Sequence, residues 1–186
     1  MKKIFRQLLF CLAIAMLAAF TWLPPAHQVP DNNRFVPEAV YELPPVATFT
    51  LTASDVVAEK GTEVCIEVKA RDFNQILSMQ YSMNWNVKML KFKEVRNYNL
   101  PGMSKSNFGE HLANQGKLTF SWYDPNLRGL SKPDGFRLYE VCFEVTGEKG
   151  SKGKFEFTGQ PTLVEIANAA GVFLDLKTEG GSVEVK

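Results

Sequence analysis

Apolar residues recur at every second position along most of the chain after residue 47. The clearest run is 77–85, where leucine, methionine, tyrosine and tryptophan alternate with serine, glutamine and asparagine. A period of two places alternate side chains on opposite faces of a β-strand, so one face of this segment is predicted to be buried and the other polar. Similar runs occupy 48–52, 64–68, 90–95, 118–122, 138–145, 155–157, 164–166 and 182–185.

Turn residues separate these runs at fairly regular intervals, and helical spacing of apolar residues is nearly absent. Many short strands joined by Gly-, Asn- and Pro-containing turns are typical of a sandwich in which the inner faces of two antiparallel sheets form the core. We therefore predict one all-β domain of about nine strands over residues 48–186.

The N-terminus has the pattern of an export signal. Lys2, Lys3 and Arg6 precede an apolar run over 8–20, and we assign residues 1–27 to a signal peptide. The alternative is an uncleaved membrane anchor, because no clear small-residue cleavage site follows the run; a spanning helix, however, would need ~20 apolar residues. Either reading predicts a secreted, periplasmic or cell-surface domain in an oxidising compartment.

Residues 28–47 are predicted to form a linker. Six of the ten prolines come before residue 46, and this part of the chain has little periodic apolar pattern. Such a composition favours an extended tether. A terminal segment without function is the alternative.

Composition and charge exclude several classes of partner and chemistry. Lys and Arg total 21 against 20 for Asp and Glu, without a basic block, so nucleic acid is not expected, and a membrane is expected only if the N-terminal segment is uncleaved. The predicted domain holds one histidine, His111, and two cysteines, Cys65 and Cys142. These provide too few groups for a zinc site or a nucleophilic triad, so we expect no enzyme activity, metal centre or cofactor. A single surface calcium ion remains an open alternative.

Acidic residues in two of the runs alternate with predicted core residues. They are Glu63, Glu67, Glu140 and Glu144. The simplest interpretation is that they face solvent on the strands, and not that they form the paired carboxylates of a glycosidase.

Four segments together resemble cohesin domains, and the match runs in order through 48–186. Residues 61–68 (GTEVCIEV) resemble the G-x-x-V-x-V-x-V strand of that family, and 79–92 (MQYSMNWNVKMLKF) is similar to the aromatic strand leading to Y-D-P-x-x-L-x-F. Residues 138–145 (LYEVCFEV) and 181–185 (GSVEV) match later strands. The chain departs from the family by having Trp-Asn-Val in place of Tyr-Asp-Pro at residues 85–87.

The resemblance implies a nine-stranded jelly-roll sandwich of a kind shared with several carbohydrate-binding modules. It also implies a non-catalytic exported module that docks a dockerin-type or other partner protein in a polysaccharide-related or cell-surface system, with calcium carried by the dockerin. Surface proteins of the Bacteroidetes type look most similar. A carbohydrate-binding module that binds polysaccharide directly is the main alternative, and a passive spacer is another.

The predicted partner-binding residues lie on the polar side of two strands. Periodicity places Ser78, Gln80, Ser82, Asn84, Thr119, Ser121 and Tyr123 outward, with Asp124 and Arg128 at the rim. In cohesins the corresponding strands contact the partner, and the resemblance maps Ser78 and Gln80 onto contact positions. Tyr123 is added as an aromatic anchor from periodicity alone. The alternative is an ordinary solvated sheet face.

Cys65 and Cys142 are both out of phase with the core residues of their strands. In cohesin-like topology these strands are antiparallel neighbours, so the two thiols could face each other and form a disulfide on the outer side of a sheet. A register slip of one residue would instead separate them by face and leave two unlinked thiols.

Overall fold

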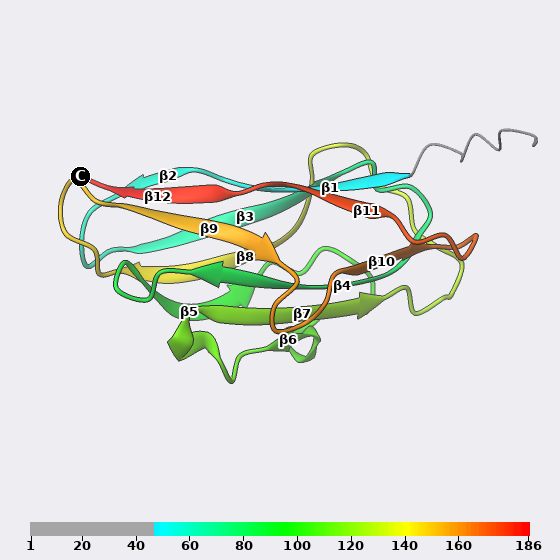
Figure 1. Cartoon of the computed structure of the whole chain (residues 1–186), viewed down its shortest axis with the longest axis horizontal. Coiled ribbons are helices and arrows are strands. Elements are labelled where there is room, and N and C mark those ends of the chain that lie inside the picture. Colours follow the sequence, from blue (N-terminus) through cyan, green and yellow to red (C-terminus); the bar gives the residue numbers. More distant parts are fainter. Residues whose placement is uncertain (1–46) are drawn as a thin grey trace, which may run out of the picture. The chain divides into compact units, whose positions relative to one another are not determined.

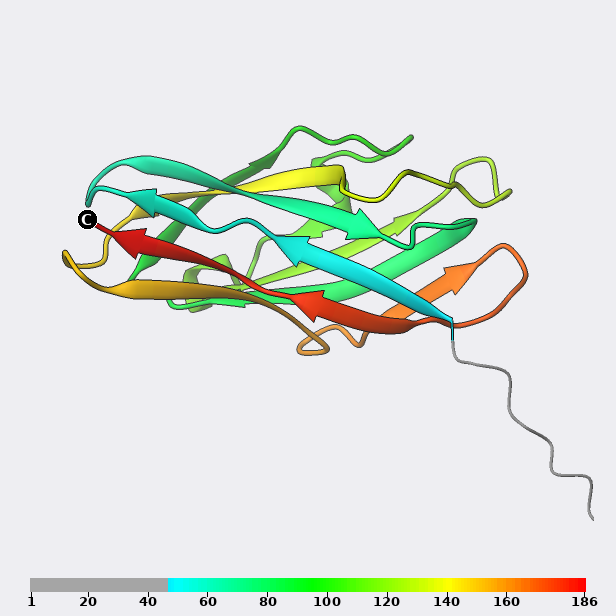
Figure 2. The same ribbon diagram turned by 90° about the horizontal axis from the view of Figure 1, so that it is seen from above.

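The computed structural model describes residues 47–186, which form a β-sandwich of two sheets (Figures 1 and 2). The strands are β1 (Thr48–Ala53), β2 (Val56–Ala58), β3 (Glu63–Arg71), β4 (Ile76–Trp85), β5 (Leu90–Arg96), β6 (Phe108–Gly109), β7 (Lys117–Tyr123), β8 (Phe136–Val145), β9 (Lys152–Thr158), β10 (Glu165–Asn168), β11 (Asp175–Glu179) and β12 (Gly181–Val185). Two short 3-10 helices, η1 (Lys105–Asn107) and η2 (Ala113–Gln115), precede β6 and β7. No helix in this described part is long and apolar enough to span a membrane. The predicted signal peptide and all but the last residue of the predicted linker lie outside the described residues.

The first sheet has the strand order β11-β1-β3-β8-β5, and the second has the order β2-β12-β9-β4-β7-β6, with β10 also paired to β4. The predicted all-β sandwich is confirmed, but the predicted strand number and the purely antiparallel sheets are wrong. Residues 47–186 contain twelve strands, and the pairs β1–β11 and β2–β12 are parallel. The strands that the sequence did not reveal, β2, β6 and β11, all lie at sheet edges. Edge strands that bury few side chains lack the alternation that would reveal them.

Two chain segments pass from the first sheet to the second side by side. One joins β1 to β2 and the other joins β11 to β12. They are in close contact at Gly181, where a Cβ atom would lie 2.5 Å from the backbone oxygen of Ser54. Only glycine allows this contact, which lies between the parallel pairs β1–β11 and β2–β12.

The core between the sheets is rich in aromatic rings. Tyr81 of β4 and Phe120 of β7 pack with ring centroids 4.9 Å apart, and Tyr139 reaches them from β8 of the opposite sheet. The Tyr81 and Tyr139 hydroxyls lie 2.8 Å apart, and the Tyr139 hydroxyl also donates to Met83 Sδ at 3.2 Å. Both tyrosines are fully buried, so this pair links the two sheets by a hydrogen bond inside the apolar core.

Candidate binding face

The polar positions of β4 and β7 meet on one surface of the second sheet. The two strands are antiparallel neighbours, and Ser78 pairs with Tyr123, Gln80 with Ser121 and Ser82 with Thr119. Directly paired residues project to the same side of a sheet. The residues that alternate with them along β4 and β7 point into the core, so this side is the outer face of the second sheet.

Ser82 lies on the outer side of β4 but is fully buried. Its hydroxyl accepts a hydrogen bond from the Thr162 backbone N–H at 2.9 Å and donates to the Thr162 carbonyl at 3.2 Å. Residues 159–164, which we call the flap, connect β9 to β10 on the outer side of the sheet (orange in Figures 1 and 2). Ser82 therefore anchors the flap, and its predicted exposure as a contact residue is wrong.

Asp124 is also buried, with 3% of its surface exposed, and does not form an open rim. Its carboxylate accepts hydrogen bonds from the backbone N–H groups of Asn126 and Arg128, each at 3.1 Å. The hydrogen bond from Asn126, with that from Arg128, holds the pKa of the Asp124 carboxyl below its usual value. Asp124 thus shapes the turn after β7, which carries the exposed Arg128 side chain.

The remaining predicted residues differ in how far they are exposed. Tyr123 is 64% exposed, whereas Thr119 is half-buried. Asn84 lies at the opposite end of β4 from the Tyr123 pairing, where it borders an open depression of about 440 Å³ together with Lys152, Lys154 and other residues. The accessible part of the face is therefore the half nearer Tyr123.

Strand β10 extends this half of the face. It pairs with β4 so that Glu165 lies opposite Gln80 and Ala167 opposite Ser78. Gln80 Nε2 donates to Glu165 Oε2 at 2.7 Å. Glu165 and Ala167 were not among the predicted site residues. Alternation around buried Ile166 could have indicated that both point outward, but only the three-dimensional pairing places them beside β4.

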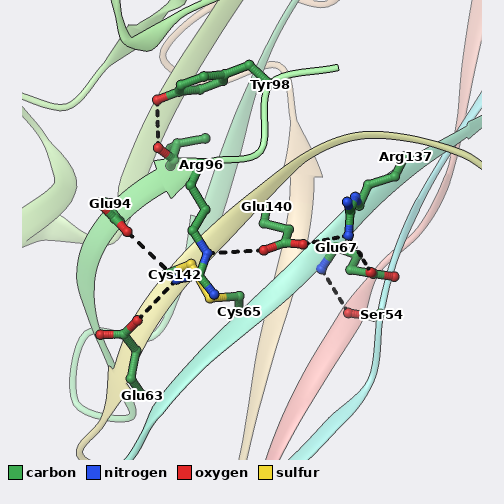
Figure 3. The surroundings of a disulfide bond; sticks show 11 residues. Ser54, Glu63, Cys65, Glu67, Glu94, Arg96, Tyr98, Arg137, Glu140 and Cys142 are labelled. Atoms are coloured by element: carbon green, nitrogen blue, oxygen red, sulfur yellow. Dashed lines mark hydrogen bonds and ion pairs between the residues drawn. A yellow bond between two sulfur atoms is a disulfide. The ribbon is translucent and has the colours of Figure 1, made fainter. Parts of the chain in front are cut away.

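The two cysteines lie on the outer face of the other sheet, between β3 and β8. Cys65 pairs directly with Cys142, and the structure joins them by a disulfide with a Cα–Cα distance of 4.0 Å. Figure 3 shows the Arg96 side chain beside this bond. The Glu63 carboxylate lies close to the two cysteine sulfur atoms, so these three residues are near enough to one another to hold a metal ion. The two sulfur atoms are bonded to each other, however, and are therefore not free thiolate ligands.

Ion pairs surround the disulfide. Arg96 Nε binds Glu140 Oε2 at 3.2 Å and Arg137 Nη1 binds Glu140 Oε1 at 2.7 Å (Figure 3). Glu140 is only 7% exposed, so the prediction that it faces solvent is wrong. Two arginines compensate for its burial, as a buried carboxylate requires. Arg137 also binds Glu67, and bonds from Lys69 and Arg137 hold the pKa of the Glu67 carboxyl low.

Comparison with known proteins identifies the fold. No protein-family model and no curated protein matches the chain. The sixth cohesin of Acetivibrio cellulolyticus scaffoldin B, solved in complex with a mutant Cel5 dockerin, is 18% identical with a TM-score of 0.63, over 75% of this chain and 100% of that one. The OlpA cohesin of Clostridium thermocellum, also in a cohesin–dockerin complex, is 15% identical with a TM-score of 0.63, over 75% and 99%.

A non-cellulosomal cohesin from the archaeon Archaeoglobus fulgidus is 21% identical with a TM-score of 0.58, over 75% of this chain and 92% of that one. The resemblance seen in the sequence is therefore confirmed at the level of the fold. Residues 47–186 form a cohesin-like domain.

Proposed function

We propose that this chain is a non-catalytic binding module that docks a dockerin-type partner protein on the outer face of its second sheet. The observation that carries the proposal is the cohesin fold, because several structures with this fold contain a cohesin in complex with a dockerin. Fold alone does not establish function, so the surface must also suit a partner.

The accessible half of the outer face has the properties of a docking surface. Ser78, Gln80 and Ser121 are short or planar polar side chains on paired strands, and Tyr123 projects beside them. A polar surface with Tyr123 as an exposed aromatic anchor suits a protein interface, which buries about 800 Å² per partner. The flap limits this surface on the Ser82 side, so the partner is expected to contact β4, β7 and β10.

The setting of this module belongs to the same proposal. The basic and apolar pattern of residues 1–27 supports export, and the proline-rich segment after it supports a tether between the docking domain and its point of attachment. We propose a role at the cell surface or in a polysaccharide-related assembly, where such a module would hold a partner enzyme.

A direct binding assay tests the partner class. Purified chain is titrated with a panel of purified dockerin modules by isothermal titration calorimetry in calcium buffer and again with EGTA. We expect at least one module to bind in calcium and to dissociate when calcium is removed, while the melting temperature of this chain is unchanged by EGTA. Failure of every dockerin in the panel to bind would contradict the proposed partner class.

A further inference from the structure

Four residues form a straight row across the second sheet at the start of β4. Tyr123 pairs with Ser78, Ser78 pairs with Ala167, and Ala167 forms an isolated bridge with Phe173. Each pair is antiparallel, and directly paired residues in such ladders project to one side. Ile166, next to Ala167, is fully buried, so the row lies on the outer face.

The row has aromatic rings at its ends and small side chains between them. Tyr123 is 64% exposed and Phe173 is 68% exposed. Three strand spacings of ~4.8 Å separate them, which places the two backbones ~14 Å apart. Ser78 and Ala167 have small side chains, so no large side chain of the row stands between the two rings.

A second, polar row runs parallel to the first. It consists of Ser121, Gln80 and Glu165, two residues further along each strand. The hydrogen bond from Gln80 to Glu165 fixes a carboxamide beside a carboxylate. Together with the Ser121 hydroxyl, this row offers both donors and acceptors next to the aromatic row.

We propose that these two rows bind a neutral polysaccharide chain directly. Sugar rings present apolar C–H faces and hydroxyl edges: the faces lie against Tyr123 and Phe173, and the hydroxyls reach Gln80 and Glu165. The Glu165 carboxylate, with no lysine or arginine in either row, disfavours an acidic glycan.

The row taken by itself has the arrangement that suits a glycan, whereas a protein partner would use the wider face of β4, β7 and β10. Protein interfaces concentrate their large apolar anchors near the centre, inside a polar rim. Here the large rings stand at the ends, and the centre holds serine and alanine. This inference does not depend on the proposed docking of a dockerin, although Tyr123 and Gln80 belong to both surfaces, so the two ligands should compete.

Polysaccharide binding by the full chain tests the inference. The chain is incubated with insoluble cellulose, chitin, β-mannan and neutral xylan, and bound protein is measured by depletion from solution. We expect retention on at least one of them, with Phe173→Ala and Tyr123→Ala each weakening it about tenfold and Phe173→Trp retaining it. The control Val57→Ala, which removes a 60% exposed side chain from β2, should bind as the unmodified chain does.

Retention on none of the four polysaccharides would overturn the inference, as would full retention by a Tyr123→Ala/Phe173→Ala variant with an unchanged melting temperature. The same variants are titrated with any dockerin that binds the chain. If Phe173→Ala weakens dockerin binding and polysaccharide is not retained, the row serves protein docking and the glycan inference fails alone. If polysaccharide is retained and no dockerin binds, the docking proposal fails alone.

Discussion

Replacing Cys65 and Cys142 together by alanine is expected to lower the free energy of unfolding by about 4 kcal/mol, because the disulfide closes a loop of 77 residues and restricts the unfolded chain. For a domain of this size the melting temperature should fall by roughly 10 °C or more. Urea unfolding of the oxidised, the reduced and the doubly substituted chain measures the effect.

The reduced domain should still fold, because β3 and β8 pair at eight positions and Arg96 and Arg137 bind Glu140 across the same face. The doubly substituted chain is the matched control, since a reductant should not change its stability. Identical unfolding curves for the unmodified chain with and without reductant would contradict a stabilising disulfide.

A second large effect is expected in alkaline solution, from the tyrosine pair in the core. Burial raises the pKa of both Tyr81 and Tyr139 above the value of ~10 for an exposed tyrosine. Above pH ~10 the unfolded chain therefore loses two protons that the folded domain keeps. The stability contributed by the pair is complete below that pH and is lost as the pH rises toward the folded-state pKa values.

The free energy of unfolding should fall by about 2.7 kcal/mol per pH unit above pH ~10 from these two groups. Urea unfolding at pH 9, 10 and 11 measures the slope. A Tyr81→Phe/Tyr139→Phe variant keeps the rings and removes both hydroxyls, so its stability at pH 7 should change little while its alkaline slope becomes shallower. The exposed Tyr123→Phe is the control and should keep the steep slope; an unchanged slope in the double variant would refute the role of the pair.

Alternation alone predicts much of this fold, because most strands bury one face. The run at 77–85 indicated both the core side and the polar side of β4, and the structure has the same core side from Met79 to Trp85. At the start of the strand, Ile76 is in the core in place of the predicted Leu77. Strand β11 could not be predicted in this way, since Asp175, Lys177 and Glu179 are exposed on an edge strand. Its parallel pairing with β1 depends on a contact between the two ends of the domain.

For the candidate site, too, sequence periodicity predicts which side of a strand a residue faces but not what covers it. Periodicity placed Gln80 and Tyr123 on the outer face, but it could not show that Ser82 is covered, because its partner Thr162 is 80 residues away in sequence. Phe173 was not predicted to belong to the face, since its place beside Tyr123 depends on the pairing of β10 with β4. Long-range contacts, and not local pattern, decide which outward residues are available to a ligand.

The location of the docking surface is tested most directly by comparing two double variants in the dockerin titration. Gln80→Ala/Tyr123→Ala alters the outer face of the second sheet. Lys91→Ala/Glu144→Ala removes an exposed ion pair of 3.5 Å from the outer face of the first sheet and should cost little stability. With both variants folded, we predict that the first loses affinity about 30-fold and that the second binds as the unmodified chain does. Undiminished affinity in the Gln80→Ala/Tyr123→Ala variant would contradict docking on this face.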